Sequence, residues 1–191
     1  MVADAAVTQQ PFLGAFVREI LEHPADRPWV MQGIGLLGLR LDEARVYRLH
    51  VWDPASCIGE APIHDHPFDF TSTVIAGEIT NLLWEESPSG VEYQRDRYTP
   101  PDEDARATDT VRLTSTSTTF TAGETYAQRA YQLHSSAQVP GTVTVLRRTF
   151  RDVRELTVCR RPGSPWISGA SRPASPDEVR RITAAARNLL D

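Results

Sequence analysis

The stretch Ile63-His64-Asp65-His66-Pro67-Phe68-Asp69 contains the most informative pattern of this sequence. One residue separates His64 from His66. Successive side chains of a β-strand point to opposite faces, so on a strand both imidazoles face the same side. Two imidazoles on one face can hold a metal ion from that side. The chain continues into residues 71–84, which predict two strands bent at Ala76-Gly77.

His134 is the candidate for a third metal ligand. It lies 68 residues after His66 (134 − 66), so only tertiary folding can bring the three side chains together. Three neutral imidazoles suit Fe(II), Zn, Ni or Cu, and Mn is a further alternative. Such a site leaves coordination positions open for a substrate and oxygen. The alternative is that the histidines are ordinary polar residues at a barrel rim, but the combined pattern favours a metal site.

Strand-like segments fill the middle of the chain, and helices are expected only near its ends. The predicted strands cover residues 45–52, 71–84, 91–98, 110–120, 142–150 and 154–160, and His134 is placed on a further strand with Leu133. The predicted helices cover residues 11–23 and 176–190, the second with Ser175 as N-cap and Glu178 at the capping-box position. The pattern predicts an all-β fold, a single jelly-roll barrel with flanking N- and C-terminal helices.

The predicted organisation is one domain with three parts. Residues 1–43 form a helix and a lead-in, residues 44–160 the barrel, and residues 161–191 a loop and a helix packed on the barrel. Residues 29–41 are interpreted as a loop that contains several glycines. A short helix or strand within this segment is the alternative. Ser87-Pro88-Ser89-Gly90 is interpreted as a turn, and Asp53-Pro54 as the end of a strand.

Composition narrows the class of protein. The net charge of −5 argues against a nucleic-acid-binding surface. All 20 basic residues are arginine, which we interpret as the bias of a GC-rich bacterial genome. No apolar run reaches membrane-spanning length, and the N-terminus lacks the pattern of a signal peptide. Cys57 and Cys159 are too few for a disulfide framework. We therefore expect a soluble, cytoplasmic protein.

These features resemble the cupin superfamily, whose members are small jelly-roll barrels with a metal ion in the mouth. Gly59, the histidine pair and Gly77 match its first motif, and Gly123 and His134 match part of its second. The carboxylate of the first motif is displaced here, because Asp69 comes slightly early. Cupins often pair through their sheets, so the resemblance implies a homodimer.

Within the superfamily, residues 63–66 and 74–78 look most like cysteine dioxygenase and related thiol dioxygenases. The similarity covers residues 44–150. It implies Fe(II) held by three histidines without a carboxylate, O2 as co-substrate, and a thiol or amino acid as substrate. Residues 143–147 lack the Ser-His-Tyr relay of that group, and Thr71 stands where some members carry a cross-linked cysteine.

Four further residues are site candidates. Asp69 is either a weak ligand, an acceptor that orients a ligand imidazole, or a solvent-exposed strand end. Tyr131 is a hydrogen-bond donor to bound oxygen or substrate, or a side chain packed at the barrel edge. Arg48 and Arg147 can bind a substrate carboxylate if they face the barrel interior, and are surface charges if they do not.

The function predicted first is a mononuclear non-haem Fe(II) dioxygenase acting on a small polar molecule. One alternative is non-redox chemistry, such as isomerisation, decarboxylation or a lyase reaction, with Zn, Ni or Mn as Lewis acid and Asp69 or Tyr131 as base. The other is a non-catalytic ligand-binding barrel.

Overall fold

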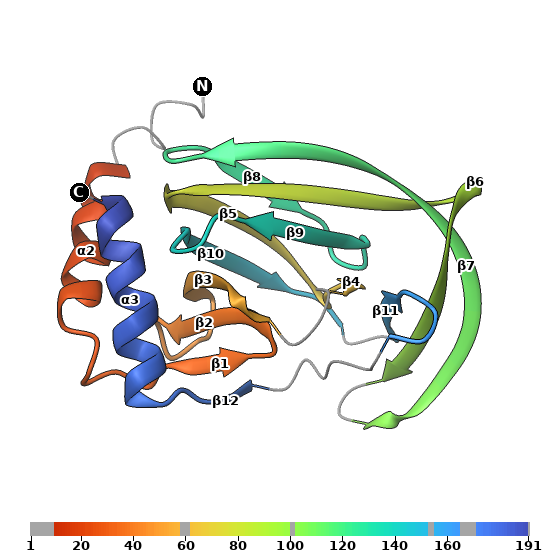
Figure 1. The fold of residues 1–191 in the computed structure, drawn as a ribbon, viewed down its shortest axis with the longest axis horizontal. Helices are drawn as coiled ribbons and strands as arrows, with labels where there is room; N and C mark the ends of the chain where they lie inside the picture. Colours follow the sequence, from red (N-terminus) through yellow and green to blue (C-terminus); the bar gives the residue numbers. More distant parts are fainter. Residues whose placement is uncertain (1–9, 58–61, 100–101, 153–154, 165–170, 191) are drawn as a thin grey trace.

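The computed structural model describes residues 10–57, 62–99, 102–152, 155–164 and 171–190. Helices α2 (Gln10–Glu22) and α3 (Pro176–Leu190) lie near the two ends of the sequence, and strands fill most of the chain between them (Figure 1). The predicted all-β class with flanking helices is confirmed. Gly59 and Arg154, which belong to a predicted motif and a predicted strand, lie outside the described residues.

The described strands form two antiparallel sheets. The seven-stranded sheet has the order β12 (Ser171–Pro173), β1 (Val30–Gln32), β2 (Ile34–Arg40), β3 (Tyr47–Cys57), β10 (Val143–Phe150), β5 (Phe68–Ala76) and β8 (Thr125–Gln128). The five-stranded sheet has the order β11 (Leu156–Arg160), β4 (Ile63–His64), β9 (His134–Gln138), β6 (Glu78–Thr99) and β7 (Asp102–Thr121), and β11 also pairs with β6. The pairing leaves the two sheets separate, so the single jelly-roll barrel stays a prediction.

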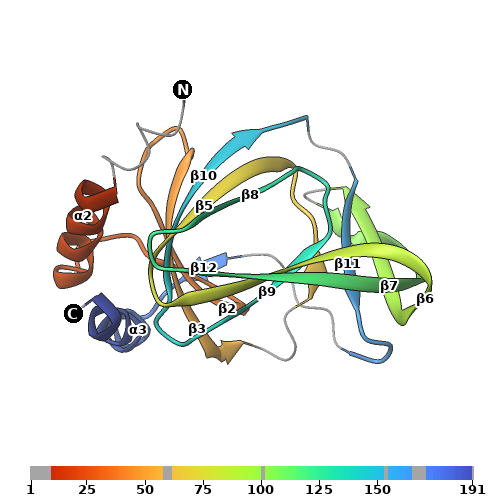
Figure 2. The same ribbon diagram turned by 90° about the horizontal axis from the view of Figure 1, so that it is seen from above.

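The helices cover one face of the seven-stranded sheet (Figures 1 and 2). The buried residues between them are Val17, Ile20 and Leu21 of α2, Val179, Ile182 and Ala186 of α3, and Leu37, Leu39, Leu49, Val51, Val143 and Val145 of the sheet. Because strand side chains alternate, the residues between these in β3 and β10 point away from the helices. No helix in the described part of the chain is long and apolar enough to span a bilayer.

The start of α3 forms the capping box that the sequence predicts. The amide of Glu178 donates to Oγ of Ser175 (3.3 Å), and the amide of Ser175 donates to Oε2 of Glu178 (2.8 Å). These two bonds satisfy backbone donors that a helix N-terminus otherwise leaves to water. They fix the helix that closes the core of the seven-stranded sheet.

We expect Ser175→Ala to lower the free energy of unfolding by about 1 kcal/mol, because the first turn of α3 loses its cap. Urea denaturation of the variant measures the change. Ser115 is exposed on β7, so Ser115→Ala serves as the matched control and should change stability by less than about 0.5 kcal/mol. Equal losses in the two variants would contradict the capping role.

The expected loop at residues 29–41 is corrected, because β1 and β2 form there and β2 is largely buried. Gly35 has φ 76°, and the pairing of β2 with β3 shifts register at this glycine. A Cβ at Gly35 would lie 2.5 Å from the carbonyl oxygen of Asp53. The glycine therefore marks a bulge within a strand. The predicted end of the next strand at Asp53-Pro54 is also wrong, because β3 continues to Cys57.

The expected turn at residues 87–90 is wrong as well, because β6 passes through it. Glu86 and Val91 both lie opposite Leu113, so the residues between them form a long bulge. A Cβ at Gly90 would lie 2.4 Å from the carbonyl oxygen of Leu113. Glycine at this position lets the two backbones approach closely, and the strand continues without a break.

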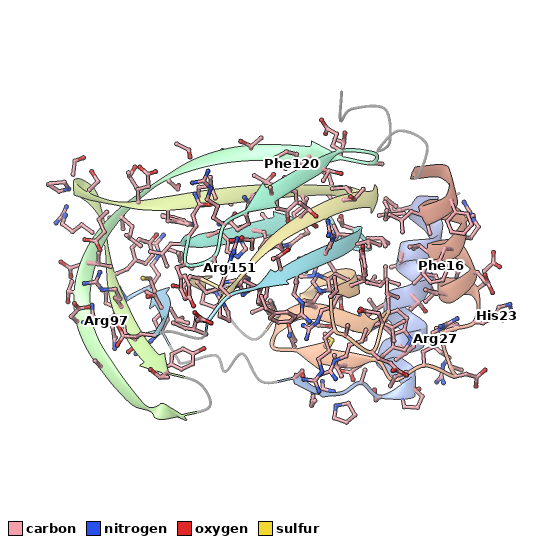
Figure 3. The ribbon with its side chains drawn as sticks, turned by 180° about the vertical axis from the view of Figure 1, so that it is seen from behind. Phe16, His23, Arg27, Arg97, Phe120 and Arg151 are labelled. Atoms are coloured by element: carbon pink, nitrogen blue, oxygen red, sulfur yellow. The ribbon has the colours of Figure 1, made fainter. Side chains whose placement is uncertain are left out.

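The far halves of β6 and β7, residues 85–99 and 102–115, form an arm that curves past β11 (Figure 1). Figure 3 shows Arg97 on this arm, at the opposite end of the molecule from Phe16 of α2. Asp96 joins the arm to β11. Its side chain has no exposed surface and accepts hydrogen bonds from Nε of Arg160 (2.9 Å) and Oγ1 of Thr108 (2.6 Å).

Candidate metal centre

The three predicted histidines lie together on the five-stranded sheet. His64 ends β4, His66 follows two residues later, and His134 begins β9, where it lies directly opposite His64 in the pairing. The ring centroid of His64 lies 4.7 Å from the ring centroids of both His66 and His134. The ring centroids of His66 and His134 are 5.1 Å apart. One ligand nitrogen of each residue lies within 4.8 Å of the others.

Hydrogen bonds define the tautomer of two of these rings. Nδ1 of His64 lies 3.1 Å from the carbonyl oxygen of Pro62, and Nδ1 of His134 lies 3.2 Å from Oδ1 of Asn81. Both partners are acceptors, so each Nδ1 carries the proton and donates. Each Nε2 then presents a lone pair. Nε2 of His134 is buried and has no hydrogen-bond partner.

Asn81 belongs to a buried chain of amides that sequence reasoning missed. Nδ2 of Asn81 donates to Oε1 of Gln128 (3.3 Å), and Nε2 of Gln128 lies 3.2 Å from both the carbonyl and Oε1 of Gln132. These bonds orient the Asn81 side chain so that its oxygen faces His134. The only available signal was an asparagine inside an otherwise apolar strand pattern, between Ile79 and Leu82.

Aromatic rings enclose the histidines. Phe68 stacks on His66 with ring centroids 4.7 Å apart, and Phe70 lies 5.8 Å from both His66 and His134. Burial lowers the pKa of all three histidines, His66 and His134 well below the ordinary value. Burial thus favours the neutral imidazole, which is the form that binds a metal ion.

The arrangement fits a transition-metal ion held through nitrogen. Metal–nitrogen bonds of about 2.1 Å allow about 4 Å at most between two ligand nitrogens. Because the three nitrogens lie within 4.8 Å, small side-chain rotations bring them into one coordination sphere. An orphaned, buried Nε2 on His134 supports the same conclusion. The three histidines can therefore hold a metal ion, and nothing in this geometry selects which metal.

Asp69 and Tyr131 make contacts elsewhere. Phe68 and Phe70 of β5 face the histidines, so Asp69 between them points to the opposite face. Its carboxylate accepts the amide of Ala130 (2.8 Å) and pairs with Arg151. The hydrogen bond from Ala130, followed by that from Arg151, holds the pKa of Asp69 below the ordinary value. The Tyr131 hydroxyl donates to the carbonyl of Asp152.

The two predicted substrate-binding arginines lie on different faces of the seven-stranded sheet. Arg147 is exposed and lines an open cavity of about 430 Å³ together with Asp69 and Arg129. Its neighbour Arg148 is buried and points the other way, with its guanidinium over the rings of Phe68 (5.0 Å) and Phe150 (4.7 Å). Arg148 thus lies on the histidine side of the sheet. The sequence had suggested Arg147 for this position.

Arg48 lies on the same face of β3 as His50, and this face turns toward the histidines. Burial, followed by the charges of Arg48 and Arg148, lowers the pKa of His50 to about 3. The charges of His50 and Arg148 in turn contribute to the lowered pKa of His66. His50 and Arg148 therefore lie within electrostatic reach of His66, and Arg48 lies within reach of His50. Arg48, His50 and Arg148 are called here the inner basic cluster.

The lowered pKa of His50 predicts acid sensitivity of the metal-free protein. In the unfolded chain this histidine takes up a proton below about pH 6.5, whereas in the folded chain it stays neutral until about pH 3. Unfolding in this window therefore takes up protons, and the stability present above pH 6.5 is lost as the pH falls. Each such histidine contributes up to about 1.4 kcal/mol per pH unit.

Chemical denaturation of metal-free protein between about pH 7.5 and pH 4.5 measures this slope. The matched variant His50→Phe keeps a ring beside Trp52 and removes one titrating group. We expect a shallower pH dependence of its free energy of unfolding. The same slope in both proteins would contradict the depressed pKa of His50.

A scan against protein-family models found no match for this chain, and a search of curated proteins found none either. The geometry of the three histidines and of the residues around them therefore carries the functional argument.

Proposed function

We propose that His64, His66 and His134 bind one divalent transition-metal ion and that the protein is a metal-dependent enzyme. The activity we propose first is that of a mononuclear non-haem Fe(II) dioxygenase acting on a small polar substrate. The two sheets would then correspond to the two walls of a cupin-like jelly roll, with the metal between them. Bound iron would supply the redox chemistry with O2, which no protein side chain can supply.

The observation that carries this proposal is the fixed tautomer of two ligand rings. The acceptors Pro62 O and Asn81 Oδ1 keep the proton on Nδ1, so the Nε2 lone pairs of His64 and His134 stay available. A metal-bound histidine usually donates the N–H of its second ring nitrogen to an oxygen acceptor. Ordinary core histidines would be expected to satisfy both nitrogens, which His134 does not.

Each neighbouring residue then has a defined task. Asn81 keeps the His134 ring in its orientation, and Phe68 and Phe70 exclude water from the side of the metal centre that they cover. Three protein ligands leave coordination positions for a substrate, which is the requirement for bringing substrate and O2 together. Arg48 faces the same interior and is the candidate for binding the substrate.

Non-redox metal chemistry has less support, because it requires a general base beside the metal. Asp69 points to the other face of β5 and is paired with Arg151, and the hydroxyl of Tyr131 is bound to a backbone carbonyl. A non-catalytic barrel remains the second candidate. It is favoured by the unusual second motif of the sequence, in which only Gly123 and His134 match the cupin pattern.

The test is the metal content of protein purified without a histidine tag, followed by oxygen consumption with small thiols and acids. About one iron per chain and oxygen uptake that depends on it would support the proposal. Zinc or nickel in every preparation, including one grown with iron supplementation, would favour non-redox chemistry. No metal after reconstitution would leave the non-catalytic barrel.

A further inference from the structure

The inner basic cluster contains buried polar groups that no protein group satisfies. Nε of Arg48 and Nε2 of His50 are both buried and have no hydrogen-bond partner. His50 is only 7% exposed, and its ring is perpendicular to that of Trp52, with the ring centroids 6.0 Å apart. A buried polar nitrogen without a partner costs free energy that folding alone does not recover. Two of them on one strand face indicate a group that the free protein does not contain.

The charges that act on Arg48 and His50 are positive. Burial and the neighbouring Arg40 and Arg45 lower the pKa of Arg48. No ion pair forms between a carboxylate and Arg48 or Arg148 within the described ranges of the chain. Asp42 is a carboxylate whose charge reaches Arg148, but its two oxygens accept the amides of Val46 (3.1 Å) and Tyr47 (2.6 Å).

Contacts with other protein groups fix the side chain of Arg148 but not that of Arg48. The guanidinium of Arg148 donates to the carbonyl of Arg45 and lies over two phenylalanine rings, so packing fixes its position. The Phe68 ring beneath it stacks on His66, which connects this side of the cluster to the metal centre. Arg48 has no comparable contact. It is therefore the cation of the cluster that is free to meet a ligand.

We propose that Arg48 and His50 form a binding subsite for the oxyanionic group of a small substrate, whose other end reaches the three histidines. Arg48 would donate through Nε and its neighbouring amino group, and His50 through Nε2. Such charge-assisted hydrogen bonds match a carboxylate or a phosphate. The substrate assignment rests on the proposed function, whereas the anion subsite does not require the metal.

The same cluster argues against an amino-acid zwitterion as the ligand. An ammonium group placed beside Arg48, His50 and Arg148 would meet positive charge and no free carboxylate. Like charges at close range disfavour binding. The ligand that fits is an anion without an ammonium group, which departs from the amino-acid substrate suggested by the sequence resemblance.

The test compares anions by the thermal unfolding of metal-free protein at constant ionic strength. Propionate and β-alanine form a matched pair, because they share the carboxylate and differ by the ammonium group. Inorganic phosphate probes the other oxyanion. A ligand that binds only the folded protein raises the melting temperature. We expect propionate or phosphate to raise the melting temperature, and the one that does so identifies the oxyanion as a carboxylate or a phosphate. We expect β-alanine to raise the melting temperature less than propionate does.

Arg48→Met removes the charge and keeps much of the side-chain volume. We expect the melting temperature of the ligand-free variant to rise, because a partly buried cation whose Nε has no partner is lost, and its affinity for the anion to fall at least about tenfold. His50→Phe should also weaken anion binding. Arg147→Met is the matched control, since Arg147 is exposed on the other face, and it should bind the anion as the parent does.

Three results would overturn the subsite. These are the absence of stabilisation by propionate and phosphate, undiminished binding in Arg48→Met, and a lower melting temperature of ligand-free Arg48→Met, which would assign Arg48 to folding. His134→Ala separates this inference from the metal centre. Anion binding that persists in this variant supports an independent subsite, even if the parent protein proves to bind no metal.

Discussion

The substitution His134→Ala is expected to weaken metal binding more than about a hundredfold. The ring supplies one of three nitrogens, and its Nε2 is the buried ligand atom without any other partner. Loss of a ligand costs more than loss of a group that only orients a ligand, which costs about 10–100-fold. The fold should persist, because the backbone pairing of β9 with β4 and β6 does not use the imidazole.

Two further variants make this result specific. Asn81→Leu removes the acceptor of His134 Nδ1 and should weaken metal binding by an intermediate factor of about 10–100. His23 is exposed at the end of α2 and outside the cluster, so His23→Ala should bind the metal as the parent does. Chelator competition gives the three dissociation constants. Full metal retention in His134→Ala would exclude this residue from the site.

The substitution Asp96→Ala is expected to lower the free energy of unfolding by about 3–5 kcal/mol. The side chain is completely buried and accepts hydrogen bonds from Arg160 and Thr108. Without it, the charge of the Arg160 side chain, which is 16% exposed, stays largely buried with no opposite charge at this position. Such an uncompensated charge is far more costly than the intact pair is stabilising.

Asp109 provides the matched control on the same pair of strands. It lies opposite Arg95 and binds it at 2.7 Å, but its side chain is 38% exposed. Arg95 keeps its second ion pair, with Glu86 at 2.6 Å, when Asp109 is removed, and a partly exposed pair contributes about 1 kcal/mol or less, so Asp109→Ala should have a small effect. Equilibrium denaturation in urea compares the two variants. Similar losses for both would contradict the structural role of the buried pair.

Local signals predicted the helices well, and failed where glycine occurs within strands. The serine, proline and glutamate at the start of α3 determine a helix end by hydrogen bonds within four residues, so sequence alone was sufficient. Gly35 and Gly90 resemble loop residues, but each lies in a bulge where a distant backbone approaches within contact distance. That approach depends on residues far away in the sequence, and no local pattern contains it.

The same distinction applies to the site. The period of two in a strand placed His64 and His66 on one side, and His134 was the candidate for the third ligand among the other three histidines. The arginines at 147 and 148 are adjacent and chemically equal, so only the pairing register shows that Arg148 is the inner one. The period of two also places His50 on the strand face of Arg48. That Nε2 of His50 has no hydrogen-bond partner depends on packing, which the sequence does not show.

The pairing of His64 with His134 has a consequence for folding. The two residues are 70 positions apart (134 − 64), and Val51 and Val143 of the other sheet are 92 apart (143 − 51). By contrast, Thr99 and Asp102 are paired within the β6–β7 hairpin. Closing long loops costs chain entropy before any contact repays it. A chain that gathers all three imidazoles has therefore already closed the long loop between β4 and β9, and metal capture reports that this part of the five-stranded sheet has formed.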